Sequence, residues 1–141
     1  LYESLITATS ADKGRRSYEE QETRKSQWLS QFIVAFGNDE GGEQTSFNGT
    51  IPQALMMFNG DLVKQATKKD GGSFLDQLAK SNLSNTQKIN YLFEAAFARR
   101  PAKKEVEVAN KLLVARKGDL TAALQDIWWA VLNSNEFILN H

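Results

Sequence analysis

Three carboxylates lie close together in residues 38–49, a stretch rich in glycine and turn-forming residues that is predicted to be one long Gly-rich loop. They belong to Asp39, Glu40 and Glu43, and carboxylate oxygens are ligands that Ca²⁺ prefers. An EF-hand needs oxygen ligands at alternate positions and a glutamate at its last position, and this stretch lacks that spacing. Two interpretations stay open: a cation site, or a solvated loop without a ligand.

Few other residues suggest catalysis. His141 is the only histidine, and the chain has no cysteine. Zinc and haem-iron sites usually need more than one such ligand, so His141 is either a binding residue or a plain tail residue. A hydrolase that uses carboxylates such as Glu40, Glu43 or Asp61 is a further hypothesis, although nothing in the sequence shows that two of them meet. We therefore predict no catalytic residue, no metal site and no cofactor.

Aromatic and basic side chains offer binding rather than catalysis. Trp128 and Trp129 are adjacent, and neighbours on a helix point to different sides. Trp129 is predicted either to bind a carbohydrate or a partner, or to flank a core that contains Trp128. Arg99 and Arg100, together with Lys103–Lys104, form a small basic patch. This patch is either a solvated turn or a contact for an anion or a partner.

The composition excludes several classes of partner. The chain has 17 basic and 17 acidic residues, so it lacks the basic excess typical of nucleic-acid-binding proteins. No run approaches the ~18 apolar residues of a transmembrane helix, and we predict no membrane insertion. The absence of cysteine excludes disulfide bonds and thiolate metal sites. With 141 residues, the chain is predicted to form a single helical domain over residues 1–141.

The helix that is predicted to lie at the centre of this domain covers residues 119–133. Its apolar residues recur at the spacing of a helix with one buried stripe, namely Leu120, Ala123, Leu124, Ile127, Trp128 and Val131. Asp119 is placed to accept a hydrogen bond from a free backbone N–H at the helix start. A helix that is apolar over more than half of its circumference needs other helices around it.

Similar spacing elsewhere predicts an all-α fold, a bundle of five or six helices without a convincing strand. Further helices are predicted over residues 1–9, 18–36, 51 to the break at 68–72, 85 to the break at 99–101, and 103–117, with short turns after residues 73 and 135. The N-terminal helices are expected to pack on the later ones, because the later ones bury too little surface alone.

Local signals place the ends of several helices. Thr50 and Ser84 each begin a capping box, and Ser73 is a further predicted N-cap. Gly60 interrupts an apolar pattern, so we expect either a kink there or another backbone packed closely over it. The residues predicted to face the core from the two neighbouring helices include Trp28, Leu29, Phe32, Ile33, Leu55 and Phe58.

Four segments occur in an order that resembles a known family. They are WLSQFIVAFG at residues 28–37, QALMMFNGDLV at 53–63, LFEAAFARRPAKKE at 92–105 and ALQDIWWAVLNSNEFILNH at 123–141. Together they resemble the C-terminal region of the planctomycete-type domain of unknown function numbered 1553, over residues 25–141. The resemblance implies that this chain is the helical C-terminal part of a large exported protein of a kind that often carries a c-type cytochrome domain. It supplies no catalytic residue. Residues 38–49 differ from that family's usual basic loop, so the resemblance assigns them no role.

These observations lead to a functional prediction and an alternative. We predict a non-catalytic helical interaction module that docks with other domains of a larger exported protein. The balanced charge, the absence of a convergent catalytic set, and the start at Leu1 in the middle of a helical pattern, as in a fragment, favour this prediction. The alternative is a glycan- or cation-binding module that uses residues 38–49 and Trp129.

Overall fold

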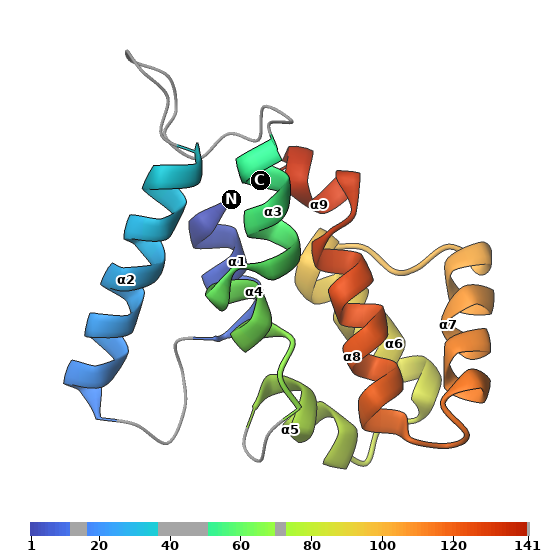
Figure 1. Cartoon of the computed structure of the whole chain (residues 1–141). Helices are drawn as coiled ribbons and strands as arrows, with labels where there is room; N and C mark the ends of the chain where they lie inside the picture. The colour runs from blue at the N-terminus through green and yellow to red at the C-terminus, as the bar shows by residue number, and fades with distance from the viewer. Residues whose placement is uncertain (12–16, 37–50, 70–72, 141) are drawn as a thin grey trace.

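The part of the chain that the structure describes folds into helices and contains no strand (Figure 1). This computed structural model describes residues 1–11, 17–36, 51–69 and 73–140. Their helices are α1 (Tyr2–Thr9), α2 (Tyr18–Phe36), α3 (Ile51–Asn59), α4 (Asp61–Ala66), α5 (Phe74–Lys80), α6 (Asn85–Phe97), α7 (Lys103–Ala115), α8 (Leu120–Leu132) and α9 (Asn135–Asn140). The all-α prediction is confirmed. The predicted number of five or six helices is wrong, because one predicted helix is divided into α3 and α4 and because two predicted turns are the complete short helices α5 and α9.

The predicted central helix is α8, and its central position is confirmed. It contacts α5, α6, α7 and α9, which lie around it in Figure 1. Leu124 and Trp128 are completely buried at its middle. The predicted cap is also present, because Asp119 Oδ1 accepts a hydrogen bond from the backbone N–H of Ala122 at 2.9 Å. The cap therefore determines where this helix starts, and the apolar spacing identifies the side chains that it buries.

Capping by serine begins two further helices as predicted. Ser84 Oγ accepts a hydrogen bond from the backbone N–H of Gln87 at 3.3 Å, and the Gln87 side chain accepts one from the backbone N–H of Ser84 at 2.8 Å. This pair is a complete capping box at the start of α6. Ser73 Oγ caps α5 by accepting from the backbone N–H of Asp76 at 3.2 Å. The capping box predicted at Thr50 lies outside the described residues.

Gly60 separates α3 from α4, so the predicted kink is a complete break. Its backbone is extended, with φ −61° and ψ 150°. A Cβ atom at this position would press against the carbonyl oxygen of Met56 and lie 2.8 Å from the Met56 sulfur. The close neighbour is therefore the preceding turn of α3, rather than another backbone segment packed over the glycine.

The exposed faces of α2 and α3 contradict part of the predicted core. Four residues that were expected inside are exposed: Leu29, Ile33, Leu55 and Phe58. On α2, Trp28 and Phe32 are buried as predicted. The reason is that α2 lies at one side of the molecule and packs mainly against α3 (Figure 1), which covers a single stripe of it. Helical spacing identifies apolar stripes, but it does not determine how many helices cover them.

The N-terminal helices pack on the later ones as predicted. α1 contacts α4 and α6. The ring of Tyr2 meets that of Phe32 edge-on at 5.4 Å, and the Tyr2 hydroxyl donates a hydrogen bond to the Lys25 carbonyl at 2.9 Å. Buried side chains from α1 through α9 join in one core cluster. The single domain predicted over residues 1–141 also includes residues outside the described ranges, and it stays a prediction. None of the helices in those ranges is long and apolar enough to cross a membrane.

Candidate functional site

A groove of about 300 Å³ opens between α6, α7 and α8. We call it the α7–α8 groove. Its apolar lining comes from α6, α7 and α8, and includes Phe93, Phe97, Val108, Leu112, Ile127 and Val131. Four polar side chains complete its lining: Lys104, Glu105, Ser134 and Glu136. The groove is thus apolar along most of its walls.

Each long wall of the α7–α8 groove is one face of a helix. Glu105, Val108, Ala109 and Leu112 follow the i, i+3, i+4, i+7 spacing on α7, and Ile127, Ala130, Val131 and Ser134 follow it along α8 and just beyond. Arg116 and Asp126 join the two helices at one end, with Nε–Oδ2 and Nη2–Oδ1 distances of 2.6 and 2.9 Å. From this end the helices diverge in Figure 1, which leaves the groove between them.

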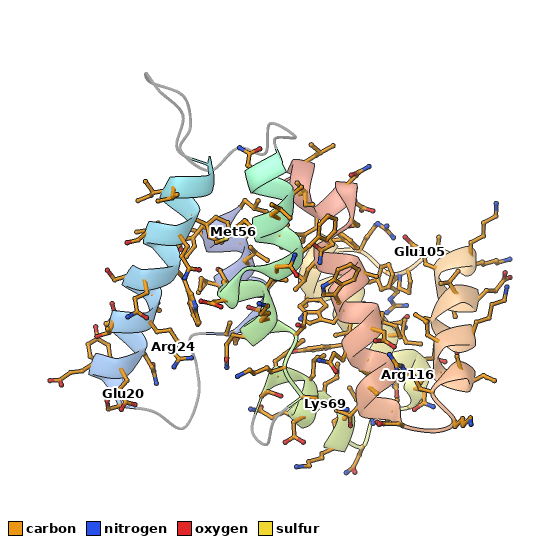
Figure 2. All side chains as sticks on the ribbon, viewed as in Figure 1. Glu20, Arg24, Met56, Lys69, Glu105 and Arg116 are labelled. Atoms are coloured by element: carbon orange, nitrogen blue, oxygen red, sulfur yellow. The ribbon has the colours of Figure 1, made fainter. Side chains whose placement is uncertain are left out.

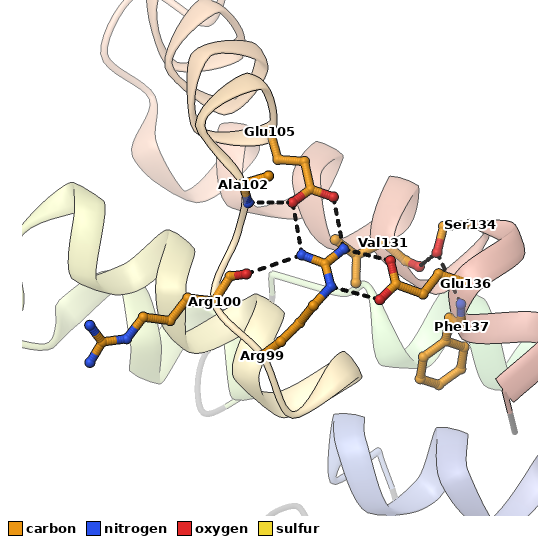
Figure 3. Close-up of polar contacts among 8 residues, drawn as sticks. All are labelled: Arg99, Arg100, Ala102, Glu105, Val131, Ser134, Glu136 and Phe137. Carbon is orange, nitrogen blue, oxygen red and sulfur yellow. Dashed lines mark hydrogen bonds and ion pairs between the residues drawn. The ribbon is translucent and has the colours of Figure 1, made fainter.

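Arg99 connects three elements beside the groove (Figure 3). It follows α6, and its Nη1 and Nη2 donate to the two oxygens of Glu105 on α7 at 2.9 and 3.0 Å. Its Nε donates to Glu136 Oε1 on α9 at 2.7 Å, and its Nη2 also donates to Glu136 Oε2. The guanidinium therefore binds both carboxylates in the bidentate geometry that arginine favours. We call these three residues the Arg99 cluster.

Local structure holds the two carboxylates in place. Glu105 Oε2 also accepts a hydrogen bond from the backbone N–H of Ala102 at 2.6 Å, at the start of α7. Glu136 follows Ser134, whose Oγ donates to the Val131 carbonyl at 2.7 Å and accepts from the backbone N–H of Phe137 at 3.2 Å. These bonds define the junction between α8 and α9, and so they position Glu136 opposite Glu105 (Figure 3).

Hydrogen bonding keeps all three groups of the Arg99 cluster charged. The hydrogen bond to Glu136 raises the pKa of Arg99 most, and the hydrogen bond to Glu105 raises it further. The bonds from Arg99 lower the pKa of both Glu105 and Glu136 below the ordinary glutamate value. The guanidinium carbon also lies 5.7 Å from the ring centroid of Phe93 and 5.1 Å from that of Phe97. One arginine between two carboxylates leaves the cluster with a net charge of minus one.

Sequence reasoning found the arginine of this cluster but missed both of its partners. Arg99 was predicted as part of a basic patch, either solvated or available to an anion or a partner. Its guanidinium is instead occupied by carboxylates of the same chain. Glu105 follows Ala102 by three residues, which is the spacing of a residue that caps a helix start, and this signal could have placed it at the turn. No local signal could have placed Glu136, since it is 37 residues from Arg99 in sequence.

Most of the residues predicted to bind a ligand lie outside the described part of the chain. These are Asp39, Glu40, Glu43 and His141, together with the rest of the predicted loop at residues 38–49. Their roles stay predictions. Trp129 is described: it is exposed, and its ring stacks on that of Phe58 with centroids 5.8 Å apart. Trp128 is completely buried, as the interpretation with one tryptophan inside and one at the flank predicts. Whether Trp129 binds a ligand stays a prediction.

The described residues offer no metal-binding group. Among the described residues, no three side chains of His, Cys, Asp or Glu gather where they could hold a metal ion. Asp61, one of the carboxylates considered for hydrolysis, lies exposed at the start of α4, and its Oδ2 accepts a hydrogen bond from Gln31 Nε2 at 3.1 Å. The other two, Glu40 and Glu43, lie outside the described residues.

A second surface feature lies where α2 meets α3. A shallow groove there is lined by Ser30, Gln31 and Val34 of α2 and by Leu55, Met56 and Asn59 of α3, with Gly60 at its end. Figure 2 shows Met56 between the two helices. Leu29 and Ile33 of α2 and Phe58 of α3 are also exposed, but they do not line this groove, and the ring of Phe58 stacks on that of Trp129 of α8. We call the groove and the side chains that line it the α2–α3 surface.

No family model matches the chain, no curated protein is significantly similar to it, and no solved structure matches it. The resemblance to the planctomycete-type domain numbered 1553 therefore rests on the four sequence segments alone, and it stays a prediction.

Proposed function

We propose that this chain is a non-catalytic helical docking module that contacts other domains of a larger protein through the α2–α3 surface. One observation carries the proposal: large apolar side chains of two neighbouring helices face solvent at the same place. Val34 is 85% exposed and Leu55 is 57% exposed. Single exposed apolar residues are normal on proteins, but contiguous exposed apolar patches mark interaction sites.

The polarity of the α2–α3 surface supports a protein partner. Within the described structure, the side chains that line its groove include no charged group, and the polar ones are Ser30, Gln31 and Asn59. The cores of protein interfaces are similarly depleted of charged residues and enriched in aromatic ones. Outside the groove, Phe58 of α3 and Trp129 of α8 add a stacked and exposed aromatic pair of the kind that contributes strongly to binding energy.

The two apolar stripes of α2 point to a second contact for this helix. Trp28 and Phe32 are buried against the rest of the chain, whereas Leu29 and Ile33 follow them at the next positions and are exposed. A helix that only completes a bundle needs one apolar stripe, with polar residues opposite. A second stripe beside the first favours a helix that is packed on two sides when its partner is present.

Site-specific photocrosslinking of the full-length protein tests this proposal. Benzoylphenylalanine at position 55 is expected to crosslink to another domain of the same protein, as identified by mass spectrometry. The matched control is the same residue at position 114, where Val114 is 78% exposed on α7 but is not part of the α2–α3 surface. This control is expected to give no such crosslink.

Two outcomes would contradict the proposal. One is that positions 55 and 114 crosslink equally to another domain. This would mean that the α2–α3 surface is no more of an interface than the rest of the molecular surface. The other is that position 55 crosslinks to the same position in a second copy of the chain, which would make the surface a site of self-association.

A further inference from the structure

We infer that the α7–α8 groove is a binding site for a small molecule with an apolar body and a primary amine. This site is separate from the α2–α3 surface and does not depend on the docking function proposed above. Nothing in the sequence pattern pointed to it, because its residues come from three helices and from the start of α9. The inference rests on the volume of the groove, the chemistry of its walls and the fixed charge at its polar end.

The volume and walls of the groove fit a compact apolar body. The cavity measures about 300 Å³, at the lower limit of typical ligand pockets. An apolar protein cavity of ~150 Å³ is large enough to bind benzene, so this groove has room for an aromatic ring with a short chain. Phe93 and Phe97 offer ring faces and edges to such a body, and Val108, Ile127 and Val131 offer aliphatic contacts.

The small residues in its walls explain why the groove is open. Ala109 of α7 and Ala130 of α8 line it at positions where a larger apolar residue would fill the space between the helices. Ala109 is buried, whereas Ala130 is exposed. Ala130 therefore provides a place where the groove can be filled without overpacking the core.

The polar end of the groove carries a fixed negative charge. Glu105 and Glu136 both line it, and both are bound to the single guanidinium of Arg99. Because one positive charge is shared by two carboxylates, one negative charge remains. A carboxylate oxygen has more than one lone pair, so each glutamate can still accept a hydrogen bond from a ligand. Ser134 also lines the groove. A primary ammonium group satisfies these acceptors and complements the charge.

Lys104 also lines the groove, and its charge must be compared with that of the Arg99 cluster. Its side chain is exposed, and among the described residues no ion pair or hydrogen bond holds its ammonium group. Lysine can lay its carbon chain along an apolar surface and extend its ammonium group into water, where the charge is well screened. The carboxylates of Glu105 and Glu136, in contrast, are held in place. The field at the polar end therefore favours a cation.

Three ligands of matched shape test this inference: 2-phenylethylamine, 2-phenylethanol and 3-phenylpropionate. Each is titrated into the ¹⁵N-labelled chain at neutral pH and low salt, and amide shifts are followed by NMR. The amine is expected to shift amides of α7 and α8 beside the groove and to bind about threefold more tightly than the alcohol, as an exposed charge pair allows. The carboxylate is expected to bind more weakly than the alcohol.

Variants of the groove test the apolar space and the polar end separately. Ala130→Leu narrows the apolar space and is expected to weaken binding of all three ligands by about tenfold, since the larger side chain competes with the ligand body for the groove. Ala115→Leu is the matched control, because Ala115 is exposed at the end of α7 and does not line the groove. Glu136→Gln neutralises the polar end and is expected to abolish the preference of the amine over the alcohol.

A further variant changes an exposed side chain, so its effect on binding does not arise from unfolding of the chain. Lys104→Gln removes the competing positive charge, and it is expected to increase the preference for the amine over the carboxylate. The inference is overturned if the carboxylate binds as tightly as the amine, if Ala130→Leu and Ala115→Leu have the same effect, or if none of the three ligands shifts amides beside the groove.

Discussion

Two adjacent tryptophans show how strongly the environment of one residue depends on helix geometry. Trp128 is completely buried in α8, while Trp129, the next residue, is 40% exposed. Trp128→Ala is expected to destabilise the chain by about 3–5 kcal/mol, because it leaves a large cavity in the core. Trp129→Ala is expected to cost less than about 1.5 kcal/mol, mainly through the loss of its stacking on Phe58. Urea unfolding measures both, and equal losses would contradict the assignment of Trp128 to the core.

The Arg99 cluster predicts a dependence of stability on pH. The pKa values of Glu105 and Glu136 are lowered in the folded chain, so the cluster stabilises it at pH values above the unfolded glutamate pKa of about 4.3. This stabilisation is lost as the pH falls through the lower folded values. Arg99→Gln is expected to cost about 1–2 kcal/mol at neutral pH, since the side chains are partly exposed. The difference from the wild type is expected to shrink below about pH 4.

A neighbouring arginine supplies the control for this experiment. Arg100 donates to a single carboxylate, that of Glu94 at 3.2 Å, and its side chain is 79% exposed. Arg100→Gln is therefore expected to change the stability by less than about 0.5 kcal/mol at any pH. If the two variants gave the same pH profile in urea unfolding, the Arg99 cluster would have no special role in the fold.

Among the elements, α6 ends in a conformation that its sequence does not favour. Ala98 follows the last residue of α6 and has φ 54°, in the left-handed region. Only glycine adopts this region without a steric cost. Ala98→Gly is expected to stabilise the chain by about 0.5–1 kcal/mol in thermal unfolding. Ala115→Gly, inside the last turn of α7, is expected to destabilise it by a similar amount. Destabilisation by both variants would show that Ala98 is not left-handed.

The break between α3 and α4 depends on the missing side chain of Gly60. Gly60→Ala places a Cβ atom against the carbonyl oxygen of Met56, so the backbone must shift. We expect a loss of about 1–3 kcal/mol in the free energy of unfolding. Asn59→Ala, at the exposed neighbouring position, is expected to change it by less than about 0.5 kcal/mol. A neutral Gly60→Ala variant would mean that the two helices can join into one.

Features of single elements were predicted from the sequence where their causes are local. Asp119, Ser73 and Ser84 cap the helices that they were expected to cap, because a cap depends on residues within one turn. A kink at Gly60 was one of the two expectations for that glycine, and the structure has a complete break there. The number of helices was underestimated, since a glycine inside an apolar pattern is compatible with either a bend or a complete break.

At the scale of the whole molecule, the sequence predicted the central helix but not the surfaces. Trp128 was placed inside because α8 is apolar on more than one side, and any packing of such a helix buries it. Leu29 and Ile33 were placed inside wrongly, because their exposure depends on which helices lie beside α2. The pairing of Arg99 with Glu136 likewise requires α6 and α9 to meet, and residue spacing carries no information on that contact.

Amide hydrogen exchange on α2 and α3, in the isolated chain and in the full-length protein, tests the proposed docking most directly. A docked surface suppresses local opening of the helices beneath it. We predict that the amides of α2 and α3 exchange at least about tenfold more slowly in the full-length protein, while those of α6 and α7 exchange equally in both. Equal exchange of α2 and α3 in the two forms would contradict the proposal that this surface docks with other domains.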